Sequence, residues 1–151
     1  MDDIDRELVE ALRSNARSTY AELARRVGLT APSAHERVAK LESSGVITGY
    51  HAAVAPSALG LGVSALIGLF LAYDVEADEV ADKLAVLPEI EDCWFVAGDE
   101  SFLLKVRVPD VDALEGTLGA LRRIRGVSRT RTTVVLSTRW ENRVRPATDT
   151  A

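Results

Sequence analysis

The sequence has few of the residues from which catalytic and metal sites are usually built. It holds one cysteine, Cys93, and two histidines, His35 and His51. A single cysteine excludes an internal disulfide, which suits a reducing compartment. Neither histidine has metal-ligand neighbours at a known spacing, and no glycine-rich phosphate-binding motif is present. We therefore expect no metal site, no catalytic residues and no cofactor, and we expect Cys93 to be a buried strand residue.

Long apolar runs and a leader-like start are also missing. The longest apolar stretch, LGLGVSALIGLFLAY, contains glycines and falls short of the roughly 18–20 residues of a membrane span. The first ten residues, MDDIDRELVE, are acidic and amphipathic, unlike a signal peptide. We therefore expect a soluble cytoplasmic protein with no membrane partner. Its net charge of −5 does not argue against nucleic acid, because a local basic face can sit on an acidic protein.

Helical periodicity is the main signal over residues 3–45, where apolar residues predict three helices. Asp2 and Asp3 can cap the first helix and suit its positive end. Gly28 ends the second, since glycine tolerates the left-handed conformation of a helix stop. Thr30 caps the third, so only a tight turn separates the second and third helices.

This tight turn between two helices is the layout of a helix-turn-helix, whose second helix enters the DNA major groove. The small residues of TAPSAH, at the start of that helix, let the backbone approach DNA. Arg37 and Lys40 are cations for phosphate or guanine, and Glu36 should face a base or pair with one of them. The predicted DNA-binding residues are Thr30, Pro32, Ser33, His35, Glu36, Arg37 and Lys40. A plain helical hairpin with a solvated polar face is the alternative.

After Gly45 the pattern changes to strands alternating with helices. Residues 46–54 predict a strand or a hinge, and residues 63–139 predict the order strand, helix (79–87), strand, strand, helix, strand. That order is typical of a ferredoxin-like βαββαβ domain. The fold class is therefore α+β: a winged-type helix-turn-helix domain over 1–46, a hinge strand and linker over 47–62, the βαββαβ domain over 63–139, and a polar tail over 140–151.

The first strand of the second domain predicts self-association. Its segment ALIGLFLA has no polar alternation, so both faces of the strand should be buried. Two helices can cover only one face of a four-stranded sheet, and a second copy is the best candidate to cover the other. The alternative, a strand deep inside a larger core, lacks the chain length to build that core.

The segment AGDES offers what a free amino acid needs. Gly98 lets backbone N–H groups approach a ligand carboxylate, and a side chain there would intrude. Asp99 and Glu100 can neutralise an ammonium group, and Ser101 adds a hydroxyl. The alternative is a solvated hairpin turn, in which these residue types are common anyway.

The sequence resembles the Lrp/AsnC (leucine-responsive, or feast/famine) family of regulators. The resemblance rests on DDIDRELVEAL, ARSTYAELARRVGLT, ERVAKLESSGVITGYHAAVAPSALG, VAGDESFLLKVRVPD and RGVSRTRTTVVL. It implies a bacterial or archaeal transcription factor that binds DNA through its N-terminal domain and a small effector, usually an amino acid, through its C-terminal domain. It also implies dimers that pair through the C-terminal sheets and often assemble to octamers or larger rings.

Carried onto this chain, the resemblance makes Thr30–Ser44 the recognition helix and Gly98–Ser101 the effector loop. It also implicates Thr133, Val134 and Val135, on the last strand, in the effector response. Ser101 stands where the family usually has aspartate, so the effector's identity does not transfer. Two alternatives remain: an architectural DNA-binding protein that ignores small molecules, and an enzyme on the same scaffold, since similar relatives act in haem-precursor decarboxylation. The intact helix-turn-helix argues against the enzyme.

Overall fold

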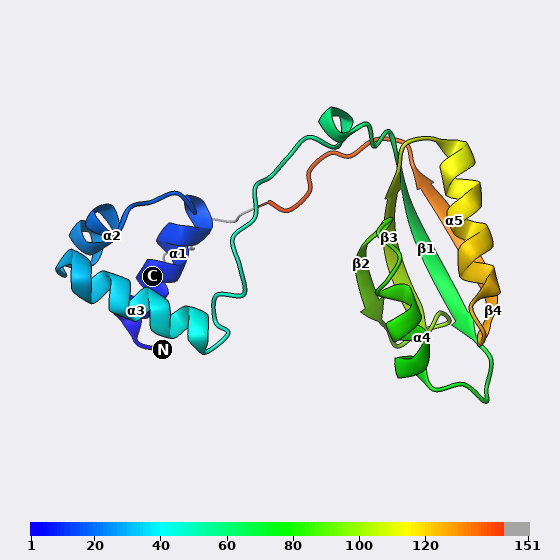
Figure 1. The fold of residues 1–151 in the computed structure, drawn as a ribbon, viewed down its shortest axis with the longest axis horizontal. Coiled ribbons are helices and arrows are strands. Elements are labelled where there is room, and N and C mark those ends of the chain that lie inside the picture. The colour runs from blue at the N-terminus through cyan, green and yellow to red at the C-terminus, as the bar shows by residue number, and fades with distance from the viewer. Residues whose placement is uncertain (144–151) are drawn as a thin grey trace. The chain divides into compact units, whose positions relative to one another are not determined.

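The structure is a computed structural model that describes residues 1–143. The chain forms two compact units, Met1–Ala53 and Val54–Arg139 (Figure 1). The boundary between them falls inside the linker expected over 47–62. Most of the polar tail expected over 140–151 lies outside the described residues.

The N-terminal unit holds three helices, α1 (Asp3–Ser14), α2 (Tyr20–Val27) and α3 (Ala31–Ser43). Asp2 and Thr19 each form a reciprocal capping box at the start of α1 and α2. Gly28 ends α2 at φ 69°, and Leu29 and Thr30 complete the short turn to α3. The buried core comes from all three helices: Leu8, Ala11, Leu12, Leu23, Ala24, Ala34, Val38 and Leu41.

The segment after α3 corrects one expectation. Residues 46–55 form no strand, and the next regular element is a 3₁₀ helix at Pro56–Leu59. The strand interpretation of this hinge, and with it the wing, is therefore wrong for residues 46–62. This stretch has no neighbouring strand to complete its backbone hydrogen bonds, and a strand requires such a partner.

The C-terminal unit confirms the predicted βαββαβ order. It consists of β1 (Val63–Leu71), α4 (Ala77–Leu84), β2 (Ile90–Phe95), β3 (Phe102–Val108), α5 (Val111–Arg123) and β4 (Val127–Val135). The strands form one sheet in the order β2-β3-β1-β4, with all three neighbouring pairs antiparallel. The helix predicted at 79–87 begins and ends earlier, at Ala77–Leu84, and a short turn joins it to β2.

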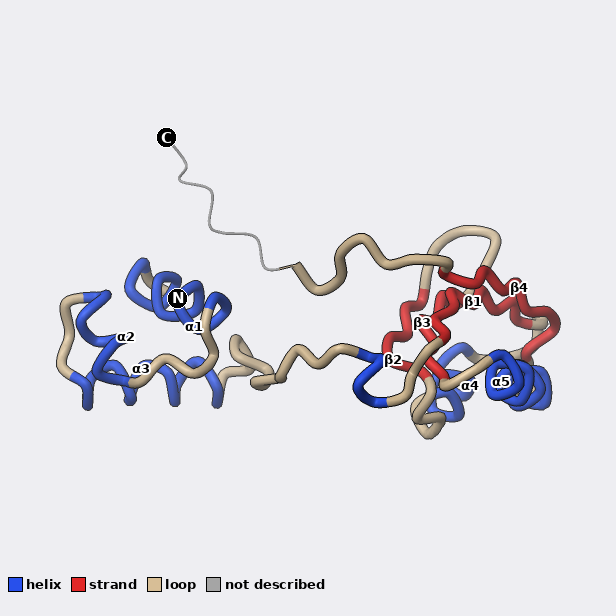
Figure 2. The backbone as a smooth tube through the Cα atoms, turned by 90° about the horizontal axis from the view of Figure 1, so that it is seen from above, coloured by secondary structure: helices blue, strands red, loops and turns tan. Residues whose placement is uncertain are grey.

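Both helices of this unit lie on the same side of the sheet (Figure 2). Alternate residues of β1 show the result, since Ala65, Ile67 and Leu69 are buried while Leu66, on the opposite face, is 39% exposed. The chain by itself therefore covers only the face that α4 and α5 contact. That a second copy covers the other face stays a prediction. Within residues 1–143, no helix is both long enough and apolar enough to cross a membrane.

Two glycines in the C-terminal unit should respond oppositely to the same substitution. Gly126 has φ +100°, and a Cβ built there would lie 2.5 Å from a methyl carbon of Val75. Gly116 is a helical residue of α5 with nothing within 4 Å of such a Cβ. We expect Gly126→Ala to lower the free energy of unfolding by about 1–3 kcal/mol. Gly116→Ala should raise it by about 0.5–1 kcal/mol.

Urea unfolding followed by tryptophan fluorescence, to which Trp94 of β2 contributes, measures both variants against the parent. If Gly126→Ala were as stable as the parent, the turn between α5 and β4 would not be constrained as described.

Candidate functional site

Two hydroxyl groups that are hydrogen-bonded to each other cap the start of α3. The side chain of Thr30 accepts a hydrogen bond from the backbone N–H of Ser33 at 3.4 Å. The two hydroxyl oxygens lie 2.9 Å apart. Pro32, in the first turn, is exposed. Thr30 and Ser33 therefore form the helix cap together, and any contact of Ser33 with a base must share or replace its bond to Thr30.

Three more of the predicted DNA-binding residues are exposed on α3. His35 is exposed, and its ring meets that of Tyr20 edge-on, with centroids 4.6 Å apart. Tyr20, at the start of α2, thus orients the imidazole. Lys40 pairs with Glu36 one turn earlier, at 3.0 Å, and the hydrogen bond from this ammonium holds the pKa of Glu36 below its usual value. Of the partners expected for Glu36, Lys40 is the one observed.

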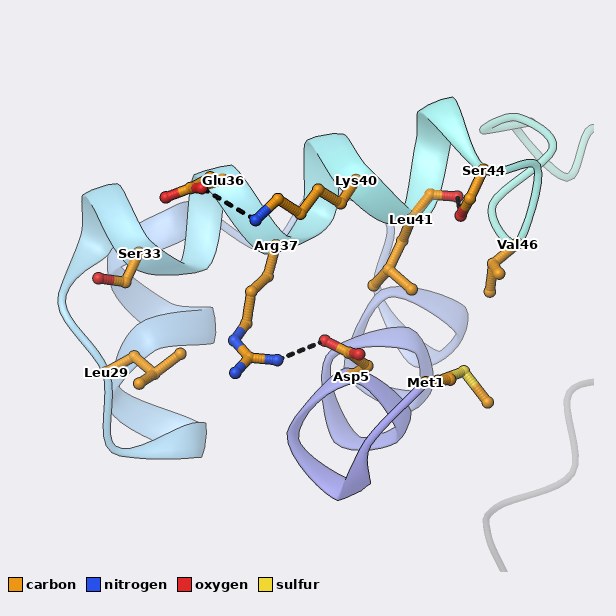
Figure 3. Close-up of a pocket in the computed structure, with 10 residues that line it drawn as sticks. All are labelled: Met1, Asp5, Leu29, Ser33, Glu36, Arg37, Lys40, Leu41, Ser44 and Val46. Carbon is orange, nitrogen blue, oxygen red and sulfur yellow. Dashed lines mark hydrogen bonds and ion pairs between the residues drawn. The ribbon is translucent and has the colours of Figure 1, made fainter.

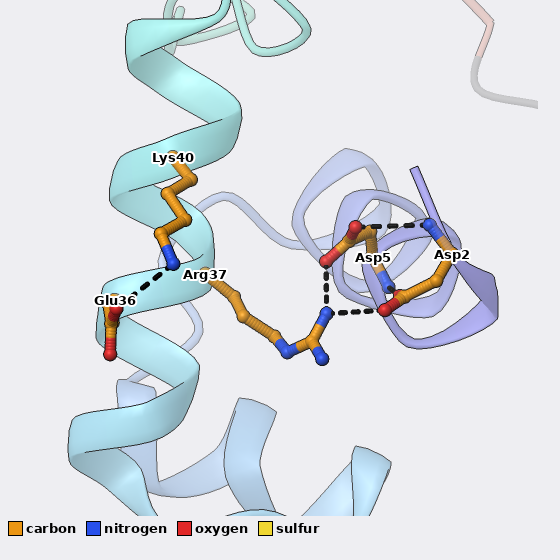
Figure 4. Close-up of polar contacts among 5 residues, drawn as sticks. All are labelled: Asp2, Asp5, Glu36, Arg37 and Lys40. Atoms are coloured by element: carbon orange, nitrogen blue, oxygen red, sulfur yellow. Dashed lines mark hydrogen bonds and ion pairs between the residues drawn. The ribbon is translucent and has the colours of Figure 1, made fainter.

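Arg37 lies apart from these residues, and its contact with phosphate or guanine stays a prediction. Its side chain reaches across to the start of α1, where one guanidinium nitrogen lies 2.7 Å from Asp2 and 2.8 Å from Asp5 (Figure 4). The backbone N–H of Asp5 and then Arg37 lower the pKa of Asp2, and both carboxylates raise the pKa of Arg37. The reason is positional: α3 buries Ala34, Val38 and Leu41, and Arg37 falls on the flank beside α1.

A groove of about 590 Å³ runs between the start of α1 and α3 (Figure 3). Arg37 extends into it toward Asp5, and Ser33, Glu36 and Lys40 border it from α3. Sequence reasoning found the caps of α1 but missed Asp2 and Asp5 as partners of Arg37. The spacing of two aspartates signals a capping box, yet no local pattern links that box to a residue more than thirty positions away.

Tyr50 is a second feature that sequence reasoning missed. Its hydroxyl donates to a carboxylate oxygen of Glu42 at 2.8 Å, which ties the segment after α3 back onto the N-terminal unit. Burial, and next the bond to Glu42, raise the pKa of Tyr50 to about 12. The chain therefore leaves this unit only after Tyr50.

The predicted effector loop joins β2 to β3 and is held at its base by backbone hydrogen bonds. The N–H of Val96 donates to Ser101 at 3.0 Å, and the N–H of Ser101 donates to Leu69 of β1 at 2.8 Å. A Cβ at Gly98 would meet nothing within 4 Å, so this chain alone does not require glycine there, and the need for glycine beside a bound ligand stays a prediction.

Glu100 turns away from the loop and onto the open face of the sheet. Its carboxylate forms an ion pair with Arg131 of β4, and its side chain is only 14% exposed. The side chain lies over Gly68, where a Cβ would come within 2.6 Å of its Cγ. The negative charge of Glu100 is thus already matched inside the unit, which makes it a poor partner for a ligand ammonium.

Asp99 and Ser101 line a pocket of about 560 Å³ at one end of the sheet. Its apolar wall includes Phe70 and Phe95, and Arg129 of β4 borders it with its guanidinium 3.8 Å from the centre of the Phe70 ring. The pocket therefore presents a carboxylate, a hydroxyl and a guanidinium beside apolar surface. This combination suits a small zwitterion with an apolar side chain.

Thr133, Val134 and Val135 do not lie beside the loop within one chain, and their part in the effector response stays a prediction. They pair with Leu66, Ala65 and Ser64, toward the start of β1, whereas the pocket takes Ser128 and Arg129 from the other end of β4. Strand geometry separates them, because each residue advances about 3.3 Å along a strand.

Other chemistry finds little support in the described residues. Among residues 1–143, no cluster of histidine, cysteine, aspartate or glutamate is arranged to hold a metal ion. Cys93 is exposed on β2, so the expectation that it is buried is wrong. β2 is an edge strand of the sheet, and its partial burial there raises the pKa of the thiol.

Comparison with known proteins gives consistent matches over both units. The model of the AsnC-type helix-turn-helix domain matches residues 1–42, and that of the Lrp/AsnC ligand binding domain matches residues 64–144. The chain is similar to the HTH-type transcriptional regulator LrpA of Mycobacterium tuberculosis, with 41% identity over 143 residues and 95% of each chain covered. It is 33% identical to the regulatory protein AsnC of Escherichia coli over 147 residues, with 97% of each covered.

A solved structure extends this similarity to the fold. A feast or famine regulatory protein from M. tuberculosis, in complex with L-methionine, superimposes with a TM-score of 0.89 at 40% identity. The match covers 96% of this chain and 98% of that one.

Proposed function

Because the chain belongs to the Lrp/AsnC family of transcriptional regulators, we propose that α3 reads DNA and that an amino acid bound beside loop 98–101 modulates this binding. The observation that carries the DNA-binding part is the short Gly28 turn that leaves the polar side of α3 exposed. Pro32, His35, Glu36 and Lys40 are the side chains that we place toward DNA, with Thr30 and Ser33 at the helix start. Enzymatic activity is set aside, because the matched proteins are regulators.

The effector in this proposal is a neutral α-amino acid with an apolar side chain. Support comes from the pocket, where Asp99 can accept from the ligand ammonium and Arg129 can donate to its carboxylate. Phe70 and Phe95 would contact the side chain. Methionine fits this description, and the similar M. tuberculosis protein was solved with it.

In the assembly we propose, the open sheet face around Leu66 pairs with that of a second copy, and dimers associate further into an octamer. The exposure of Leu66 and the family resemblance support this arrangement. Thr133, Val134 and Val135 would then lie near contacts between copies, where they could affect an effector response without lining the pocket of their own chain. A regulator of chromosomal genes would act in the cytoplasm of a bacterium or archaeon.

Two residues of the effector loop favour an alternative function that does not involve an amino acid. Ser101 stands where the family usually has aspartate, and Glu100 is engaged by Arg131. An architectural DNA-binding protein that ignores amino acids is therefore the second candidate function.

DNA binding through α3 is tested with two lysines. Lys40→Ala removes a cation from the outward side of α3, and Lys83→Ala removes one from the last turn of α4. If Lys40 contacts phosphate, its loss should weaken binding to all duplexes and reduce the slope of log affinity against log salt by about 1. Lys83→Ala should change neither quantity.

Fluorescence anisotropy with a duplex selected by the parent protein, at several salt concentrations, gives both numbers. A DNA affinity that does not change with salt concentration would count against the proposed interface. Equal affinities and salt slopes for the Lys40 and Lys83 variants would also count against it.

Effector binding is tested by calorimetry with L-methionine. Asp99→Asn should weaken binding about ten- to a hundredfold, because a charge-assisted hydrogen bond contributes about 1.5–3 kcal/mol. Asp82→Asn, which removes the same charge from α4, is the matched control and should bind as the parent does. If Asp99→Asn also binds like the parent, Asp99 is not the ammonium partner. If the parent binds none of the twenty amino acids, the architectural function replaces the responsive one.

Pairing through the sheet is tested by light scattering on the full chain. Leu66→Glu places a charge on the open face, and Val86→Glu places one at an exposed position after α4. We expect the Leu66 variant to lose the mass of the parent assembly, because an unpaired charge inside an interface is costly. The Val86 variant should keep it. An unchanged mass for Leu66→Glu would move the interface elsewhere.

A further inference from the structure

The contact between α3 and α1 is built around one arginine and two aspartates. The carboxylates of Asp2 and Asp5 cap α1 reciprocally: that of Asp2 accepts the backbone N–H of Asp5 at 2.8 Å, and that of Asp5 accepts the backbone N–H of Asp2 at 3.1 Å. The same carboxylates accept from a single nitrogen of Arg37 at 2.7 and 2.8 Å. We refer to Asp2, Asp5 and Arg37 as the α1–α3 latch.

The latch is less exposed and has more hydrogen bonds than an ordinary surface ion pair. The side chain of Asp5 is 18% exposed and that of Arg37 is 33% exposed. Exposed single pairs contribute little, but a shared cation with several charge-assisted hydrogen bonds is stronger and more directional. In the described part of the chain it supplies the ion pairs that join α1 to α3, whereas Arg26 and Glu7 join α2 to α1.

The position of Arg37 connects the latch to the side of α3 that we propose to bind DNA. Arg37 adjoins Glu36 and lies within one turn of Ser33 and Lys40, yet its guanidinium points across the groove rather than outward (Figures 3 and 4). The buried side chains of Ala34, Val38 and Leu41 set which side of α3 turns inward. The hydrogen bonds of Arg37 on one flank add a directional constraint to this packing.

We propose that Arg37 is a positioning residue for DNA recognition, which holds α3 at a fixed orientation on α1 through Asp2 and Asp5 and does not contact phosphate. This inference rests on the proposed function that α3 binds DNA. It predicts that Arg37 supports sequence discrimination rather than general affinity, because base contacts depend on orientation more closely than phosphate contacts do.

In the competing role, Arg37 contacts a DNA phosphate, and Asp2 and Asp5 bind its guanidinium only while DNA is absent. The two roles predict opposite signs for one substitution. Removing a latch aspartate would release Arg37 to phosphate and tighten binding in the competing role. In the positioning role the same substitution breaks the latch and weakens binding to the preferred site.

The experiment measures affinity of the full chain for a duplex selected by the parent and for a scrambled duplex, each at several salt concentrations. Arg37→Gln and Asp5→Asn should each weaken binding to the selected duplex about five- to tenfold and change binding to the scrambled duplex less than about twofold. The salt slope of Arg37→Gln should match that of the parent. The double variant should be no weaker than either single variant, because both changes break one latch.

Two further variants control for charge and folding. Asp3→Asn removes the same charge from the same turn of α1, but Asp3 pairs with Arg6 and its side chain is 97% exposed. It therefore reports the general effect of a lost carboxylate on DNA affinity, and Asp5→Asn should bind the selected duplex more weakly than it does. Arg37→Lys, which can still reach one carboxylate, should recover part of the discrimination. Circular dichroism verifies that each variant is folded at the assay temperature.

Two results would overturn the latch as a positioning device. The first is Asp5→Asn binding more tightly than Asp3→Asn. The second is a salt slope for Arg37→Gln reduced by about 1 with equal losses on both duplexes, as a phosphate contact requires. A parent that binds neither duplex would instead overturn the proposed function itself, and with it the role of Arg37 in DNA recognition.

Discussion

Burial of one stripe of α3 determines what the rest of the N-terminal unit can do. Ala34, Val38 and Leu41 turn inward, so the polar residues of this helix are divided between an outward side and two flanks. The outward side keeps Glu36 and Lys40, one flank meets Tyr20 through His35, and the other meets α1 through Arg37. The same packing that stabilises the unit therefore sorts side chains into those able to face a ligand and those used internally.

Most charges at the candidate DNA-binding surface already have partners. Lys40 is paired with Glu36, and Arg37 with two aspartates. A DNA phosphate must therefore compete with a carboxylate for each cation, which reduces the net gain from each contact. For a chain with net charge −5, this arrangement favours discrimination through geometry over strong general attraction to nucleic acid.

An analogous division operates in the C-terminal unit, where β1 is the central organiser. Its neighbours β3 and β4 pair along its length, and the carbonyl oxygen of Leu69 of β1 accepts a hydrogen bond from the backbone N–H of Ser101. Glu100 reaches the open face through the space that Gly68 leaves, while Asp99 stays with the pocket. Adjacent residues of one loop thus contact the open sheet face and line the candidate pocket, so the loop physically connects the proposed effector site with the proposed dimer surface.

The sequence by itself determined the elements and their order, because caps, turns and apolar periodicity act between residues close in the chain. Thr30 and Gly28 mark the helix-turn-helix, and the βαββαβ order follows from alternating patterns. Only the tertiary structure decided which charges are engaged. Arg37 and Lys40 look equivalent in sequence, yet one pairs across to α1 and the other along its own helix. Asp99 and Glu100 look equivalent in sequence as well. In the structure, Glu100 pairs with Arg131 and lies over Gly68 on the sheet. The physical reason is that an ion pair depends on distance in space, and distances between separate elements are set by packing rather than by local sequence.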